Sequence, residues 1–215
     1  MRNLVILRFT QDDTWHNFGE SLPLFTSCLK TSGEKYLKEQ SHMTEQIFPL
    51  ITFYQGWKTW QQSLVEIIAP LSPEQLAFPA SAHHWSIGMI SQHIVGCRIW
   101  WFQVWMGEGH PDLAPLARWD PQDKKEQLTL SAGELVTGLE RTWQMIADAL
   151  ARWTPADLDY IFPCPASLSE EERRIFPELT RQWIIWHVLE HEIHHGGELS
   201  LALGNLQLDG IYGSA

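Results

Sequence analysis

The chain has 215 residues, enough for one domain with an extension, and 44% of them are hydrophobic, which is sufficient for a buried core. With 15 basic against 26 acidic residues the formal net charge is −11, and no basic patch is present, so neither nucleic acid nor membrane is an expected partner. No apolar run approaches the ~20 residues of a membrane span, and the N-terminal stretch LVIL is too short for a signal peptide.

Three cysteines, at positions 28, 97 and 164, stand far apart in the sequence. They predict neither a disulfide framework nor a cysteine zinc site, and this usage fits a cytoplasmic protein. Residues 1–42 contain a short strand-like stretch and an apolar loop or helix fragment, but no chemical signature. We therefore divide the chain into an N-terminal extension, residues 1–42, and a main domain, residues 43–215.

Helical periodicity begins near Thr44 and is expected to end by Ala69, because Pro70 follows. Pro49 is expected in the first turn, where its missing N–H is harmless. In the connector LSPEQL, Ser72 can cap a single helical turn that starts at a proline. The apolar stripe of this first helix consists of Ile47, Ile51, Tyr54, Trp57, Leu64 and Ile68.

A second long helix is predicted from Ser86 to Met106, ended by Gly107 and Gly109. A histidine occupies a core position in its otherwise apolar row. Alone, such a residue is more often a hydrogen-bonded core histidine than a metal ligand. The row consists of Ser86, Ile90, His93, Cys97, Trp100 and Val104.

Residues 107–130 are expected to form a polar connection, after which Ser131 and Glu134 form a capping box that opens a third helix. This helix has an apolar stripe without plausible ligands, so we interpret it as scaffold. The stretch after it, TPADL, resembles SPEQL after the first helix. A weak internal repeat is therefore predicted, in which the second and fourth long helices correspond. SLSEEERRIF is expected to be a solvated loop or short helix.

The last long helix is predicted over residues 178–203, and it carries four of the ten histidines. His191 and His195 fall on its core-facing stripe, one turn apart, so both imidazoles can reach one divalent ion. The alternative is a pair of buried histidines bonded to neighbours. The Gly196-Gly197 pair costs about 1 kcal/mol per glycine in helix propensity, which indicates close approach of another helix or a ligand.

His93 on the second helix is the natural third ligand opposite this pair. Zinc, nickel, iron and manganese all accept neutral imidazole, and three protein nitrogens leave a coordination position open, as in catalytic sites. His187 or His194 as a fourth ligand would instead indicate a structural ion. Glu190 and Glu192 are expected to point away from the stripe. Two other carboxylates remain as candidate general bases, those of Glu66 and Glu198.

The motifs WSIGMISQHIVG, LSPEQL and WHVLEHEIHHGGEL resemble the DinB/YfiT-like superfamily of metalloenzymes, over residues 43–204. The resemblance implies an all-α four-helix bundle in which helix 4 packs beside helix 1. It also implies a divalent metal, most often zinc or nickel, held by three histidines that correspond to His93, His191 and His195. The sequence departs from many relatives in having Gly196, where they have arginine, and in its extra imidazoles and long N-terminal extension.

Relatives of this kind include transferases and isomerases that use low-molecular-weight thiols such as mycothiol or bacillithiol. The resemblance thus implies a metal-dependent enzyme, a thiol transferase or hydrolase, that activates a thiol or water for a small-molecule substrate. The alternative is a non-catalytic bundle with a structural metal, a stress-related binding module. A metal-free interaction domain and a homodimeric assembly also stay open.

Overall fold

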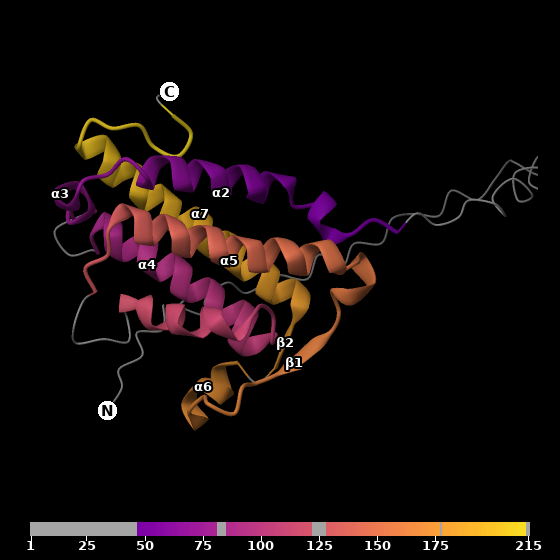
Figure 1. Cartoon of the computed structure of the whole chain (residues 1–215). Helices are drawn as coiled ribbons and strands as arrows, with labels where there is room; N and C mark the ends of the chain where they lie inside the picture. Colours follow the sequence, from indigo (N-terminus) through magenta and orange to yellow (C-terminus); the bar gives the residue numbers. More distant parts are fainter. Residues whose placement is uncertain (1–46, 81–84, 122–127, 177, 214–215) are drawn as a thin grey trace, which may run out of the picture. The chain divides into compact units, whose positions relative to one another are not determined.

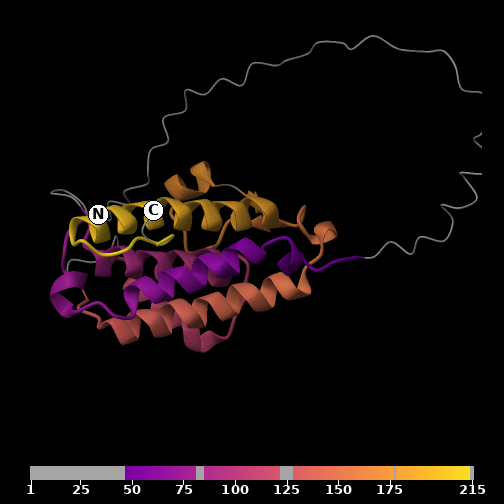
Figure 2. The ribbon, with the colours of Figure 1, turned by 90° about the horizontal axis from the view of Figure 1, so that it is seen from above.

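The computed structural model describes residues 47–80, 85–121, 128–176 and 178–213, so the predicted N-terminal extension, and the start of the main domain at residue 43, lie outside the described part. Four long helices lie side by side (Figures 1 and 2). The prediction of an all-α bundle is confirmed. No described helix is both long and apolar enough to pass through a lipid bilayer. The four helices are α2 (Gln55–Ile68), α4 (Ile87–Arg98), α5 (Ala132–Arg152) and α7 (Arg181–Asn205).

The first long helix starts later than its periodicity predicted. Pro49 is extended, with φ −66° and ψ 152°, and precedes a 3-10 turn, η2 (Leu50–Thr52), whose Leu50 N–H donates to the carbonyl of Trp153 at 2.7 Å. Ile47, placed on the predicted core stripe, is 68% exposed. The reason is that Leu50 anchors the chain to the end of α5 before α2 begins, and this tertiary contact overrides local periodicity.

Two long helices begin at the predicted positions, each with a serine as its N-cap. The Ser86 hydroxyl accepts a hydrogen bond from the backbone N–H of Met89 at the start of α4. Ser131 and Glu134 form the predicted capping box at the start of α5. Ser72 likewise caps the single turn α3 (Pro73–Leu76), so local hydroxyl and proline signals located these ends correctly.

The second half of the predicted second helix has a different geometry. After Arg98 the chain continues as a π-helix, η3 (Ile99–Trp105), and Gly107 follows with φ 72°. A π-helix has more residues per turn than an α-helix, so successive core-facing residues are about one residue further apart in the sequence. Trp101 and Trp105 are therefore buried, whereas Val104, which α-helical spacing placed in the core, is 38% exposed.

The connection before α5 is more ordered than its polar composition predicted. It contains a 3-10 helix, η4 (Pro111–Trp119), which packs against α4 and buries Leu113 and Leu116. The Gln92 side chain, on α4, donates to the carbonyl of Leu128 at 2.9 Å. The connection therefore contacts α4 through η4 and, near its end, through Leu128.

The predicted internal repeat has a structural counterpart. After α2 comes the capped turn α3 and then a bridge between Pro79 and Ser86, just before α4. After α5 comes the 3-10 turn η6 (Pro155–Asp157), and then strand β1 (Ile161–Pro163) pairs antiparallel with β2 (Glu178–Thr180), just before α7. Because residues 178–180 form β2, α7 begins at Arg181 rather than at the predicted Glu178. The charged insertion contains the short helix α6 (Glu170–Ile175).

A buried ion pair joins all four long helices. The guanidinium of Arg98 donates to both carboxylate oxygens of Glu192, at 2.7 and 2.9 Å, and neither side chain is exposed to solvent. Trp57 on α2 donates to Glu192 at 2.9 Å, and Arg98 also donates to the carbonyl of Leu139 on α5 at 3.0 Å. Glu192 therefore faces the core, contrary to the prediction, because α7 is buried on more than the histidine stripe.

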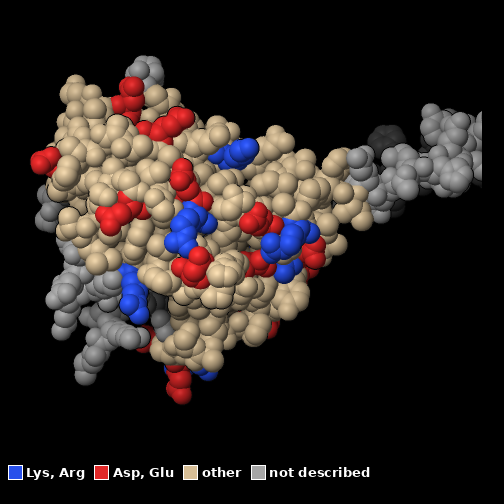
Figure 3. Space-filling view, in the orientation of Figure 1, with Lys and Arg blue, Asp and Glu red and all other residues tan. Residues whose placement is uncertain are grey.

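The expected neighbourhood of the first and last helices is present. In addition to the Trp57–Glu192 hydrogen bond, the ring of Trp60 on α2 lies where a side chain at Gly196 would project. The tail after α7 folds back, so that Ile211 is buried and its N–H donates to the Ser200 hydroxyl at 3.2 Å. On the face shown in Figure 3, basic residues are interspersed with acidic ones and form no continuous patch.

Candidate metal site

Three imidazoles converge between α4 and α7. His93 lies on α4, and His191 and His195 lie one turn apart on α7, with a ligand nitrogen of each within 4.8 Å of the others. The Nε2 atoms of His93 and His191 are 2.9 Å apart. All three residues are buried, with exposed fractions of 5%, 8% and 5%. The structure therefore brings together the three residues that the sequence identified.

Carboxylates fix the orientation of two of these rings. Nδ1 of His93 lies 3.0 Å from Oδ1 of Asp120, and Nδ1 of His195 lies 2.7 Å from Oε2 of Glu198. An ionised carboxylate can only accept a hydrogen bond, so each Nδ1 carries a proton and donates it. Each Nε2 then carries a lone pair and no proton, which is the form of histidine that binds metals.

The three-histidine cluster fits a divalent metal ion. Nε2 of His195 is buried and has no hydrogen-bond partner in the described part of the chain, and Nε2 of His93 directs its lone pair toward His191. Two nitrogens bound to one zinc ion at about 2.0–2.1 Å are about 2.9–3.4 Å apart for coordination angles between 90 and 110°. The His93–His191 separation of 2.9 Å lies at the lower end of that range, and without an ion it is a hydrogen bond in which Nε2–H of His191 donates to Nε2 of His93.

Burial favours the neutral form of the imidazoles of His191 and His195. Burial, with the added repulsion of its neighbouring imidazoles, holds the pKa of His191 far below its usual range. Burial also lowers the pKa of His195 to about 4, although Glu198 opposes the shift. The indole of Trp85 covers part of the cluster, since its ring centroid lies 4.7 Å from that of His93 and 6.3 Å from that of His195. Neutral imidazole is what a metal requires.

These shifts predict that acid destabilises the metal-free protein. The folded-state pKa values of His187 and His195 are about 4, against 6.5 when unfolded. As pH falls from 6.5 toward 4, the unfolded chain gains protons that the folded protein does not, so stability is lost by up to about 1.4 kcal/mol per pH unit per histidine. Urea unfolding with chelator at pH 7.5, 6.0 and 5.0 measures this slope. Exposed carboxylates contribute little above pH 5, so a flat profile contradicts the prediction.

The other imidazoles of α7 do not complete the cluster. His187 stacks on Trp183 at 4.8 Å between ring centroids, and its centroid is 6.1 Å from that of His191. His194 is largely exposed, with Nε2 3.6 Å from Glu198. His194, His195 and Glu198 also come within ligand distance of one another, but on a partly exposed surface and at the expense of the His195–Glu198 hydrogen bond.

The sequence-based reasoning missed part of the surroundings of the cluster. Asp120 lies in the polar connection between α4 and α5, and no local pattern links it to His93, 27 residues away. Glu198 was among the candidate carboxylates, and it contacts His195 one turn away. Glu66 is exposed on α2. Cys97 is buried, and burial raises the pKa of its thiol well above the usual range, as expected of an apolar core cysteine rather than a ligand.

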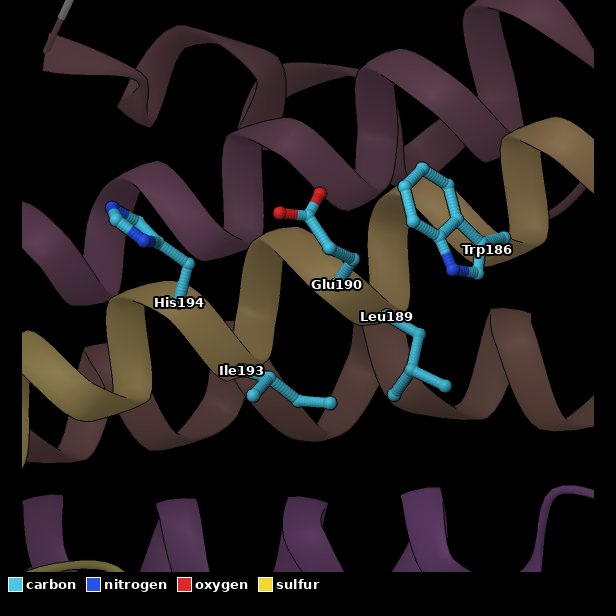
Figure 4. Close-up of a pocket in the computed structure, with 5 residues that line it drawn as sticks. All are labelled: Trp186, Leu189, Glu190, Ile193 and His194. Carbon is cyan, nitrogen blue, oxygen red and sulfur yellow. The ribbon is translucent and has the colours of Figure 1, made fainter. Parts of the chain in front are cut away.

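A surface depression on α7 lies next to the cluster, since the ring centroid of His194, one of its lining residues, is 5.1 Å from that of His195. It is lined by Trp186, Leu189, Glu190, Ile193 and His194, whose side chains project from the outer side of the helix (Figure 4). None of the three clustered histidines lines it. The depression is therefore a separate feature of the surface.

Comparisons with known proteins agree with the resemblance seen in the motifs. The model of the DinB superfamily matches residues 57–199. The crystal structure of a DinB-like protein from Bacillus cereus ATCC 10987 is similar to this chain, with a TM-score of 0.55 and 20% identity, covering 75% of this chain and 95% of that one. At this identity the likeness shows the fold alone. A search of curated proteins gives no match. Because the family model spans more than half of the sequence, the chain belongs to the DinB superfamily.

Proposed function

We propose that this protein is a metal-dependent enzyme whose divalent ion is held by His93, His191 and His195. The observation that supports this most is the set of three buried imidazoles with nitrogens within 4.8 Å of one another. Only three protein nitrogens converge there in the described part of the chain, one fewer than in closed structural zinc sites. The open position is where a thiol or water would be activated.

The roles of the residues follow from the geometry. His93 and His195 would bind through Nε2, because their Nδ1 atoms donate to Asp120 and Glu198. When bound, a divalent ion supplies a Lewis acid that lowers the pKa of a coordinated water or thiol and so provides a nucleophile near neutral pH. Zinc and nickel suit the imidazole set best, and iron and manganese are also accepted. A small-molecule substrate and a low-molecular-weight thiol are the proposed partners, in a cytoplasmic setting.

Metal content tests this proposal directly. Purified wild-type protein is expected to contain about one divalent ion per chain, and His191→Ala substantially less, since one of three ligands is lost. His194→Ala is the matched control, because this histidine is on the same helix but 57% of its side chain is exposed. Elemental analysis of the three proteins measures the difference. Equal, negligible metal in wild type and His191→Ala would refute the proposal.

The burial of the cluster supports one alternative, a structural ion in a non-catalytic bundle. The three histidines are at most 8% exposed, and Trp85 partly covers them. In that case the cobalt-substituted protein would not respond to an added thiol. An enzyme with an open coordination position would show a changed visible spectrum when a small thiol is titrated in. Thiols that bind then become the first cosubstrates to assay with candidate electrophiles.

A further inference from the structure

The connection between α4 and α5 delivers a carboxylate to the histidine cluster. Asp120 follows η4 directly, and its Oδ1 accepts a hydrogen bond from Nδ1 of His93 at 3.0 Å. The side chains of His93 and Asp120 are only 7% and 20% exposed, so water competes weakly for this contact. A charge-assisted hydrogen bond in such a place orients a ring firmly.

A glycine on α4 makes this approach possible. A Cβ added at Gly96 would lie 2.8 Å from Cβ of Asp120 and 3.2 Å from both its Cα and its backbone N. Because backbone atoms are involved, no rotamer change could relieve the overlap. The main chain of Asp120 therefore rests directly on α4, three residues after His93.

A second glycine, Gly138 on α5, leaves room for the neighbouring residue, Trp119. A Cβ at Gly138 would overlap the indole of Trp119, so this ring fills the space that the glycine leaves. By contrast, Gly133 on the same helix has no atom within 4 Å of its Cβ position. Glycine in a helix interior costs about 1 kcal/mol relative to alanine. The helices α4 and α5 thus each have a glycine at the point where the segment Trp119–Asp120 packs against them.

We propose that Asp120 is a positioning residue for the metal site. By accepting from Nδ1, it holds His93 in the tautomer whose Nε2 faces His191, and its negative charge makes that nitrogen a stronger donor to a cation. Gly96 and Gly138 act indirectly, by seating the segment that carries Asp120. This inference rests on the proposed function, and it assigns a role to a stretch that otherwise only joins two helices.

Metal affinity is the first test. Asp120→Asn is expected to weaken binding of Zn²⁺, measured by competition with a chromophoric chelator, by about 10–100-fold. Asp112→Asn is the control, because Asp112 also contacts a histidine, His110, at 2.8 Å, but that pair is exposed and is not part of the cluster. The control is expected to bind within about twofold of wild type. If Asp120→Asn binds Zn²⁺ as tightly as the control, the inference is wrong.

The tautomer of His93 gives a test that does not require metal. Long-range ¹⁵N–¹H NMR spectra of the metal-free protein at pH 7.5 are expected to show His93 protonated at Nδ1. In Asp120→Asn the preference should relax, because an amide can either donate or accept. Finding His93 protonated at Nε2 in wild type would overturn the positioning role. If wild type shows the Nδ1–H tautomer but takes up no Zn²⁺, it is the proposed function that fails and the orienting contact that survives.

Discussion

Glu192→Ala is expected to destabilise the protein by about 3–5 kcal/mol, a large fraction of the stability of a typical domain. The substitution leaves the guanidinium of Arg98 buried without a counter-ion, since its two contacts with Glu192, at 2.7 and 2.9 Å, disappear. The indole of Trp57 also loses its acceptor. Urea unfolding followed by circular dichroism measures the change.

Two further variants show whether the loss of stability comes from the unpaired buried charge rather than from the loss of any carboxylate on α7. Glu190→Ala removes a carboxylate two residues away whose side chain is 39% exposed, and it is expected to change stability by no more than about 0.5 kcal/mol. The double variant Arg98→Met with Glu192→Leu removes both charges and is expected to recover much of the loss, because apolar pairs can replace buried ion pairs. If Glu192→Ala loses less than about 1 kcal/mol, Arg98 is not held as described.

Gly196→Ala and Gly197→Ala are expected to have opposite effects on stability. At position 196 the new methyl group would overlap the ring of Trp60 and lie 2.7 Å from Cδ1 of Ile211. Overpacking of this kind costs about 1–3 kcal/mol. At position 197 no atom lies within 4 Å of the Cβ position, so alanine is expected to stabilise the helix by up to about 1 kcal/mol.

The pair is its own control, because both substitutions add the same methyl group to adjacent residues of α7. Thermal unfolding of the metal-free proteins should place Gly196→Ala below wild type and Gly197→Ala at or above it. Equal stability of the two variants would show that the ring of Trp60 moves aside without penalty, and that its packing does not determine the glycine at position 196.

The starts of α4 and α5, and the grouping of the three histidines, were predictable because their signals are local. Ser86 and Ser131 begin helices through hydroxyl caps that involve only the next three residues. His191 and His195 share a helix face because of their spacing alone. His93 could then be assigned as their partner, because it interrupts an apolar row in another helix.

The features that escaped prediction depend on contacts between distant residues. Leu50 is anchored to Trp153, which delays the start of α2. Asp120 reaches His93 only once the connection is folded against α4. Glu192 was expected only to point away from the histidine stripe, and its burial arises because α7 has neighbours on that side too. The periodicity of apolar residues identifies one buried face of a helix. It does not reveal that a helix is buried on several faces.

The buried Arg98–Glu192 contact also bears on the spacing of the three clustered histidines. Glu192 is the residue after His191, and Arg98 lies five residues after His93 on the facing helix. The ion pair between them therefore holds α4 and α7 in axial register next to the imidazoles. Sliding by one turn, about 5.4 Å, would break it. The relative positions of the three imidazoles are thus set by the packing of α4 against α7.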